Sequence, residues 1–521
     1  MGAPEISAES QDIAAQHIRG SSLLLVGRLI ALAIDFGAQV LLVRYLSKPD
    51  FGAWSYALAL AAMLGGIALF EMGNTLARFI PMYRERGEPN SMAGAMALGF
   101  AVVGGFGVLI AMAVIISLGF LGFRPTSDPE ALHLLVLVAF LIPIQALDSL
   151  FTTLFATLGS SRAIFLRQSI LGPTLRIALV GALIGAGADV EFLARGYVAI
   201  SVFALVVSGL MFWRALRQRR AIGAGERRAL HFPAREIFLF ATPLLASTLV
   251  WLLMESSDAV LLGYFFDTDA VASFRAVLPL ARMNTLVIIT FGMLYLPMAS
   301  RLYARGDQEQ LHELYWQSAL WMTILTFPIL LLTFSFAPST TLDTYGSEYA
   351  GSAPIMSVLA IGYFFHTALG FNGVTLRIYN KLRYAVSIDV GMAVLNVVVN
   401  LILIPRMGAL GAAIGTSATM ILHNVLKQIG LSRYTGWPMF RLRYALFYSG
   451  LLATALAMMG LQEILPATLL VALPLSAVVS LVALWVSRGL LDIDALFPEL
   501  RRVPVVGKLI QRRNARPETK S

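Results

Sequence analysis

Long apolar runs separated by short polar loops dominate this chain. Each run has about twenty residues or more, which is long enough for a helix to cross the roughly 30 Å hydrocarbon core of a bilayer. Because backbone exposed to lipid must satisfy its own hydrogen bonds, the runs predict helices rather than open strands. We therefore predict an all-α polytopic membrane protein with about fourteen spans, at residues 22–43, 52–79, 92–120, 131–157, 164–186, 192–213, 237–263, 270–300, 312–336, 353–377, 384–405, 409–431, 442–461 and 466–487.

The pattern repeats along the chain at an offset of about 220 residues. Residues 41–60 read LLVRYLSKPDFGAWSYALAL, and residues 261–280 read LLGYFFDTDAVASFRAVLPL. Each stretch is a helix end, a short polar loop and the start of another helix. Residues 159–162 fall opposite 380–383 in the same way. The repeat predicts two pseudo-symmetric copies of one membrane unit, an arrangement common in transporters, whose substrate site lies between the copies.

Charged residues outside the spans predict the topology. The outer loops would hold five cationic and ten acidic residues, whereas the inner loops and tails would hold about thirty Lys and Arg. Cytoplasmic loops collect Lys and Arg, so both termini are predicted to be cytoplasmic. The predicted organisation is an amino-terminal arm (1–21), an N-lobe (22–213), a basic linker (214–236), a C-lobe (237–431), two further helices (432–487) and a basic tail (488–521).

Composition supports the membrane interpretation. Hydrophobic residues make up 58% of the chain and charged residues 13%, about half the charged share of soluble proteins. The chain has no cysteine, which excludes disulfides, cysteine-ligated zinc and thiol catalysis. The net charge of +9 is better explained by topology than by nucleic-acid binding. Glu5, Glu9 and Asp12 precede the first apolar run, so a cleavable signal peptide is not expected.

Carboxylates inside the apolar runs are candidates for ion coupling. Each ionisable group near the bilayer centre costs about 2.5–3.5 kcal/mol or more unless it faces a partner or water. Asp35 in the first span falls opposite Glu255 in the seventh, and Asp258 lies one turn beyond Glu255. We expect these three carboxylates to couple transport to H⁺ or Na⁺.

Intramembrane arginines are candidates for substrate binding. The helical rise places Arg176 and Arg282 near the midplane, at the depth of Asp35. An arginine fork can donate two hydrogen bonds to a phosphate while it stays charged. The alternative is structural pairing, for which Arg28 with Glu71 and Asp258 with Arg275 stand at matching depths. The candidate substrate-binding residues are Arg28, Arg176, Arg275 and Arg282.

Three passages carry a resemblance to a known family. They read RYLSKPDFGAW at 44–54, NVVVNLILIP at 396–405 and GALGAAIG at 408–415. The chain resembles the multidrug/oligosaccharidyl-lipid/polysaccharide (MOP) exporter superfamily, most of all its Wzx-type oligosaccharide flippases and polysaccharide exporters. The resemblance implies two six-helix lobes around a central cavity, with two extra helices at the carboxyl end.

The resemblance also implies a function. A bacterial inner-membrane flippase would move an undecaprenyl-pyrophosphate-linked oligosaccharide to the outer leaflet by alternating access, for O-antigen or exopolysaccharide assembly. Such a protein is not an enzyme, and no catalytic residue, cofactor or metal is expected. The implied partners are the lipid-linked oligosaccharide, H⁺ or Na⁺, anionic lipids at the basic tail, and, as an open alternative, a polysaccharide polymerase. Nucleic acid is not expected.

Two other functions compete with the flippase. A cation-coupled multidrug exporter of the MATE type would use an acidic cavity, which Glu255 and Asp258 could supply but Arg176 and Arg282 would oppose. A membrane glycosyltransferase or polymerase could use the DxD string at 267–269. That string falls in a short outer loop, away from cytoplasmic nucleotide sugars.

Overall fold

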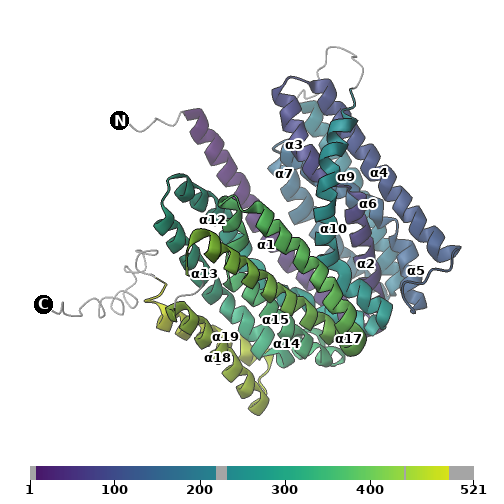
Figure 1. The fold of residues 1–521 in the computed structure, drawn as a ribbon. Coiled ribbons are helices and arrows are strands. Elements are labelled where there is room, and N and C mark those ends of the chain that lie inside the picture. Colours follow the sequence, from purple (N-terminus) through teal and green to yellow (C-terminus); the bar gives the residue numbers. More distant parts are fainter. Residues whose placement is uncertain (1–7, 219–230, 439–441, 492–521) are drawn as a thin grey trace, which may run out of the picture. The chain divides into compact units, whose positions relative to one another are not determined.

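The computed structural model describes residues 8–218, 231–438 and 442–491, and every regular element in these ranges is a helix (Figure 1). The first half contains α1 (Ala8–Tyr45), α2 (Lys48–Ala68), α3 (Met72–Glu85), α4 (Pro89–Gly119), α5 (Pro129–Val138), α6 (Leu141–Thr157), α7 (Ser161–Ile164), the π-helix η1 (Phe165–Leu171), α8 (Gly172–Ala186), α9 (Val190–Gln218) and α10 (Ala234–Phe265). The second half contains α11 (Thr268–Arg282), η2 (Met283–Thr285), α12 (Leu286–Ala304), α13 (Gln308–Leu330), η3 (Leu331–Ser335), α14 (Ala337–Tyr345), η4 (Ser347–Ser352), α15 (Ala353–Ala368), α16 (Asn372–Ile378), α17 (Leu382–Thr435), α18 (Leu442–Ile464) and α19 (Leu469–Ser487).

Polar side chains and glycine fix many of the helix ends. Ser47 accepts a hydrogen bond from the backbone N–H of Asp50 at the start of α2. Asp128 and Asp307 cap α5 and α13 in the same way. Such caps satisfy backbone donors that a first turn leaves without partners. Gly187 ends α8 with a positive φ of 60°, a conformation that glycine adopts without steric cost.

Helix boundaries recur at the offset that the sequence pattern predicts. Helix α1 ends at Tyr45 and α2 begins at Lys48. Helix α10 ends at Phe265 and α11 begins at Thr268, each 220 residues later. The two copies of the pattern therefore fold into the same local helix–loop–helix element.

Several helices are long and apolar enough to cross a membrane. Within the described residues there are ten, or up to twelve if each of two bent pairs, 129–157 and 234–265, counts as one span. The chain is a multi-pass membrane protein. One of the ten, α17, is 54 residues long and contains a break at Gly408 (φ 56°, ψ −135°), where the sequence predicts a loop between two spans.

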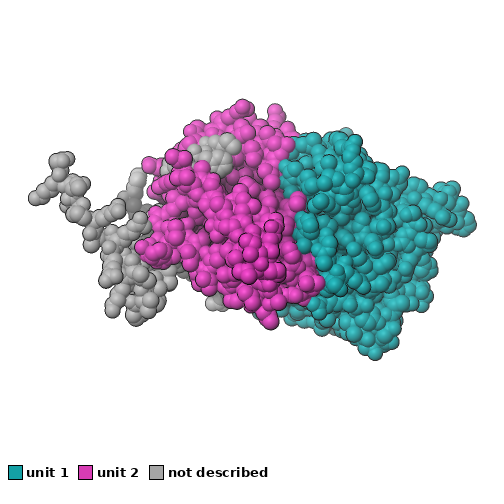
Figure 2. Space-filling model, turned by 90° about the horizontal axis from the view of Figure 1, so that it is seen from below, with its two compact units in different colours: residues 1–279, 344–355, 389–419 teal, residues 280–343, 356–388, 420–521 magenta. Residues whose placement is uncertain are grey.

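The chain forms two compact units, which Figure 2 shows in teal and magenta. Unit 1 contains residues 1–279, 344–355 and 389–419. Unit 2 contains residues 280–343, 356–388 and 420–521. The boundaries predicted for the N-lobe and C-lobe stay a prediction. Parts of the predicted arm (1–7), linker (219–230) and tail (492–521) lie outside the described residues.

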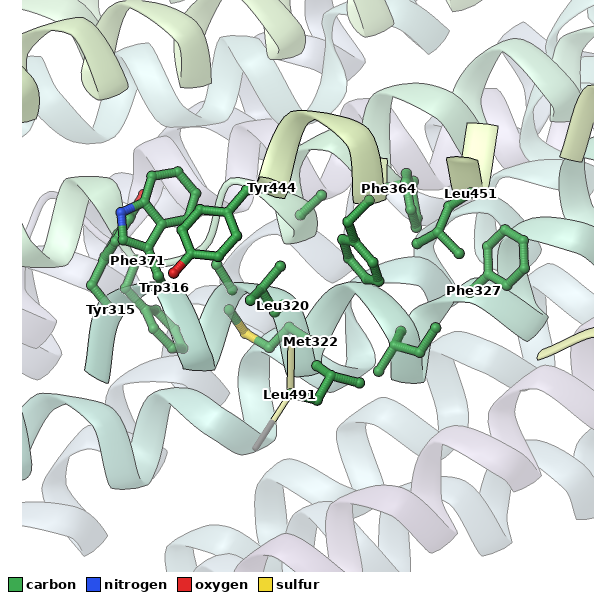
Figure 3. Close-up of a cluster of buried hydrophobic side chains, with 14 of the residues drawn as sticks. Tyr315, Trp316, Leu320, Met322, Phe327, Phe364, Phe371, Tyr444, Leu451 and Leu491 are labelled. Carbon is green, nitrogen blue, oxygen red and sulfur yellow. The ribbon is translucent and has the colours of Figure 1, made fainter. Parts of the chain in front are cut away.

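Unit 2 has an aromatic core built on α13 (Figure 3). Trp316 packs against Tyr444 of α18, with ring centroids 4.8 Å apart. Leu451 of α18 and Leu491 beyond α19 belong to the same cluster. The indole N–H of Trp321 donates to the Leu491 carbonyl at 3.1 Å. Since lipid tails are as apolar as these side chains, close packing rather than water exclusion holds such a cluster together. It fixes α18 and α19 to α13.

Candidate functional site

An ion pair inside unit 1 joins two of the predicted site residues. Arg176 Nη2 on α8 lies 3.0 Å from Asp35 Oδ2 on α1. The side chains keep 38% and 31% of their surface exposed, so the pair is only partly enclosed. Asp35 Oδ1 is buried and has no hydrogen-bond partner among the residues that the structure describes. The pair therefore uses one carboxylate oxygen and leaves the other unsatisfied, which costs free energy.

A second arginine on the same span, Arg167, has more hydrogen-bond partners than Arg176 and is less exposed. Arg167 on η1 donates from Nη2 to Asp148 Oδ2 at 2.8 Å and from Nε to Asp148 Oδ1 at 3.1 Å. Ser208 of α9 lies 3.2 Å from the same Nε. The Arg167 side chain is only 14% exposed. This is a fork-to-fork pair, the most specific geometry that arginine and carboxylate can form.

Neither Arg167 nor Asp148 is among the site residues predicted from the sequence. Arg167 lies near one end of its predicted span, and no partner was identified for it. The sequence does offer one indication of this ion pair. Asp148 is an isolated acid in the apolar run 131–157, which neighbours the run that contains Arg167. Buried charges in a membrane need partners, so an unassigned acid and an unassigned arginine on consecutive spans could have been matched.

The two arginines converge on Gly172, the first residue of α8. A Cβ added at Gly172 would lie 3.2 Å from Arg167 Nη1 and 3.6 Å from Arg176 Nη2. Arg176 Nε also donates to the Gly172 carbonyl, at 3.4 Å. The junction of η1 and α8 therefore brings two guanidinium groups to one glycine.

The other predicted residues of α1 and its neighbours are also placed. Gln39, one turn beyond Asp35, donates to the Arg275 carbonyl on α11 at 3.1 Å. Arg28 is exposed on α1, and Arg275 is half-buried. The suggested pairing of Arg28 with Glu71 is wrong. Glu71 accepts instead from Asn74, at 2.9 Å, and from Thr248 of α10.

Asp258 on α10 lies in a cluster of oxygen-bearing side chains from α17. Its carboxylate accepts from Asn400 Nδ2 at 2.6 Å and from Thr416 Oγ1 at 3.0 Å. Asn396 donates to Thr419 at 3.0 Å beside them. Asp258 is 6% exposed and Asn400 is fully buried. Asn400 Oδ1 has no hydrogen-bond partner within the described residues.

The oxygen-bearing side chains of this cluster are of the kinds that bind a hard cation. Hard cations take oxygen ligands from carboxylates, amides and hydroxyls, and Asp258, Asn400 and Thr416 supply one of each. The described residues hold no group of three or more His, Cys, Asp or Glu that could bind a transition metal. Glu255, the third predicted coupling residue, is half-buried one turn earlier on α10.

Arg282 belongs to unit 2 and is held by an aromatic residue. Its Nε donates to the hydroxyl of Tyr363 at 3.0 Å, and its guanidinium carbon lies 6.0 Å from the centre of that ring. The structure thus places a predicted substrate-binding arginine beside Tyr363 of α15, a residue that the sequence does not predict at this site.

Comparison with known proteins now identifies the family. Residues 17–303 match the model of the polysaccharide biosynthesis protein family. The chain belongs to this family. An uncharacterized membrane protein of Methanocaldococcus jannaschii is 22% identical, over 77% of this chain and 80% of its own length. A Shigella flexneri protein named as a candidate O-antigen transporter is 21% identical, over 79% of this chain and 96% of its own.

Two solved structures show the fold of this polysaccharide biosynthesis family member. The lipid II flippase MurJ in an inward closed conformation superimposes with a TM-score of 0.67, at 15% identity, covering 91% of this chain and 99% of MurJ. An inward-facing MATE transporter of the MOP superfamily gives a TM-score of 0.62 at 15% identity, covering 78% and 96%. The chain thus shares the fold of MurJ and of a MATE transporter, as its resemblance to the MOP exporters predicts.

Proposed function

We propose that this protein is a flippase that moves an undecaprenyl-pyrophosphate-linked oligosaccharide from the inner to the outer leaflet by alternating access. The observation that carries the proposal is the incomplete Asp35–Arg176 pair. Arg176 is charged and partly exposed within a membrane span, and it binds a single carboxylate oxygen. A pyrophosphate offers more acceptor oxygens than that carboxylate does.

The contrast with Arg167 supports a substrate role for Arg176. Asp148 and Ser208 fix Nε and Nη2 of Arg167, so most of its donors already have protein partners. Arg176 sits on the same span with a weaker partner and more than twice the exposed fraction. Arg28, Arg275 and Arg282 complete the proposed set of substrate-binding arginines, since each adds positive charge to a span.

The finer architecture belongs to the same proposal. Fourteen spans follow if α1, the two bent pairs and the two halves of α17 on either side of Gly408 are each counted as spans. The helix boundaries that recur 220 residues apart support two six-helix lobes, with α18 and α19 added at the end.

The proposed location is a bacterial inner membrane, with both termini in the cytoplasm. Arg217 lies over the Trp213 ring at the end of α9, and Arg488 lies over Trp485 at the end of α19. Tryptophan and arginine collect at membrane interfaces, and cytoplasmic ends carry the excess of Arg and Lys. Both helix ends are cytoplasmic in the proposed topology.

Transport is proposed to couple to a cation at Asp258, with Asp35 and Glu255 as further candidate coupling groups. The oxygen cluster around Asp258 supports Na⁺ or H⁺ there. The same buried acid also favours a second function, a cation-coupled drug exporter, whose fold the chain shares. Membership of the polysaccharide biosynthesis family and the intramembrane arginines favour the glycan lipid.

The test replaces the pair without leaving a buried charge. In a strain that lacks the native gene, the double variant Arg176→Gln/Asp35→Asn should lower surface glycan at least tenfold and accumulate lipid-linked oligosaccharide in the inner leaflet. The loss of a charge-assisted hydrogen bond of about 1.5–3 kcal/mol predicts that size. Arg195→Gln, which removes an exposed arginine paired with Glu191, is the matched control. Normal surface glycan in the double variant, at wild-type expression, would reject the proposal.

A further inference from the structure

We propose that Arg167 and Arg176 together form a diphosphate-binding site over Gly172, and that Asp35 occupies Arg176 in competition with that diphosphate. The site rests on the proposed function, which it deepens by adding Arg167, Gly172 and a competitor. The ligand class is the diphosphate of a lipid carrier. The proposal has three structural supports: the helix geometry, the unequal anchoring of the two arginines and the glycine between them.

The π-helix η1 is what brings the arginines together. Nine residues separate Arg167 from Arg176, about two and a half turns of an α-helix, which would put them on opposite faces. A π-helix bonds residues five apart instead. The backbone N–H of Gly172 donates to the Arg167 carbonyl, five residues earlier, so Arg167 is brought beneath Gly172. Arg176 follows Gly172 by one α-helical turn, and all three share a face.

The two arginines are anchored unequally. Asp148 and Ser208 bind Nε and Nη2 of Arg167, and its Nη1 lies near Gly172. Arg167 is therefore a fixed donor. Arg176 is held by Asp35 through one oxygen, and the other oxygen of Asp35 is buried with no partner in the described ranges. A diphosphate that reaches both guanidinium groups replaces one weak contact with several charge-assisted ones.

Gly172 places no side-chain atom beside the two guanidinium groups. Any side chain there begins with a Cβ 3.2 Å from Arg167 Nη1, closer than ordinary van der Waals contact. The same span offers a matched control, because a Cβ at Gly181 of α8 would meet nothing within 4 Å. The comparison of Gly172→Ala with Gly181→Ala therefore separates crowding of the arginines from a general effect of alanine in this helix.

The experiment measures binding of farnesyl diphosphate to the purified full-length protein in nanodiscs of zwitterionic lipid. Arg167→Gln/Asp148→Asn, which keeps a neutral hydrogen-bonding pair, should weaken binding at least tenfold. Gly172→Ala should weaken it several-fold and Gly181→Ala should not. Asp35→Asn should tighten binding about three- to tenfold, because the competitor loses its charge. A merely structural Asp35–Arg176 pair predicts weaker binding in that variant.

Competition identifies the ligand chemistry. Inorganic pyrophosphate should displace farnesyl diphosphate, and inorganic phosphate should do so much more weakly. Displacement by phosphatidylglycerol nanodiscs but not by pyrophosphate would assign the site to anionic phospholipid and overturn the diphosphate assignment. Wild-type affinity in Arg167→Gln/Asp148→Asn, with normal thermal unfolding of that variant, would also overturn the site.

The outcomes for the site and for the proposed function are separate. A wild-type protein that binds farnesyl diphosphate through these residues but transports no glycan lipid retains the site and loses the function. A protein whose transport requires Arg176 but not Arg167 retains the function and loses the site.

Discussion

Asp258 shows, at the scale of single residues, how a buried charge is accommodated. A carboxylate with 6% exposure is costly inside a protein unless hydrogen bonds or a cation compensate it. Asn400 and Thr416 provide hydrogen bonds. The amide oxygen of Asn400 is buried and has no partner in the part of the chain that the structure describes. A cation bound to the Asp258 carboxylate and to the Asn400 amide oxygen would compensate the charge of the first and give the second a partner.

A first prediction follows for sodium. Replacing choline chloride with NaCl should raise the unfolding temperature of the wild type by several degrees, since a ligand at a hundred times its Kd stabilises the folded state by about 2.7 kcal/mol. Asp258→Asn should abolish most of this rise. Intrinsic fluorescence of the seven tryptophans reports the transition. Glu463→Gln, which changes an exposed acid, should respond as the wild type does. An undiminished sodium response in Asp258→Asn contradicts the assignment.

Single residues were predictable from the sequence only where helical spacing is regular. Asp35 and Arg176 stand at similar depths on their spans, and depth follows from counting residues along an α-helix. Their direct contact confirms that reasoning. Arg167 lies near the end of its predicted span, so a count of depth does not select it. Nothing in the run FLRQSIL indicates the π-helix that brings it close to Arg176. The sequence does not predict the donors to Asp258, because they lie on α17, far along the chain.

At the scale of elements, helix α17 shows most clearly where the sequence predicts an interruption in a helix. Its 54 residues are interrupted at Gly408, whose backbone is non-helical (φ 56°, ψ −135°). A residue with a Cβ is strained in that region. The sequence predicts the interruption, because the predicted spans 384–405 and 409–431 leave residues 406–408 between them. The bent pairs at 129–157 and 234–265 were predicted as single uninterrupted spans, since their apolar pattern continues through each bend.

A second prediction concerns this interruption. Gly408→Ala should destabilise the protein by about 1–3 kcal/mol, the cost of a strained backbone, and lower its unfolding temperature. Gly391→Ala in the same helix is the control, because a Cβ there meets nothing within 4 Å. Alanine in an α-helix is favoured over glycine by about 1 kcal/mol, so this control should be neutral or stabilising. Equal unfolding temperatures for the two variants would show that the backbone at residue 408 is not strained.

At the scale of the whole molecule, the distribution of Lys and Arg among the loops predicts how the chain is oriented in the membrane. Helix placement alone does not say which ends of the spans face the cytoplasm. The excess of Lys and Arg in alternate loops does, because such loops resist translocation. The matching offset of the helix boundaries near residues 45 and 265 supports the same phase in both halves of the chain.

A third prediction tests that orientation with fusions. A fluorescent protein fused after Ser521 should fluoresce, since it folds in the cytoplasm, and alkaline phosphatase at the same position should be inactive. Alkaline phosphatase inserted at Glu463, in the loop between α18 and α19, should be active because that loop is predicted to be outside. Activity at Ser521, or inactivity at Glu463 with normal expression, would invert or break the topology.

The wide separation of Asp258 from its donors also has a consequence for synthesis. Asn400 and Thr416 follow it by 142 and 158 residues. At a translation rate of about 5–20 residues per second, the ribosome needs on the order of ten seconds to deliver them. Helix α10 must therefore wait in the insertion machinery, or enter lipid with an acid that lacks these two donors.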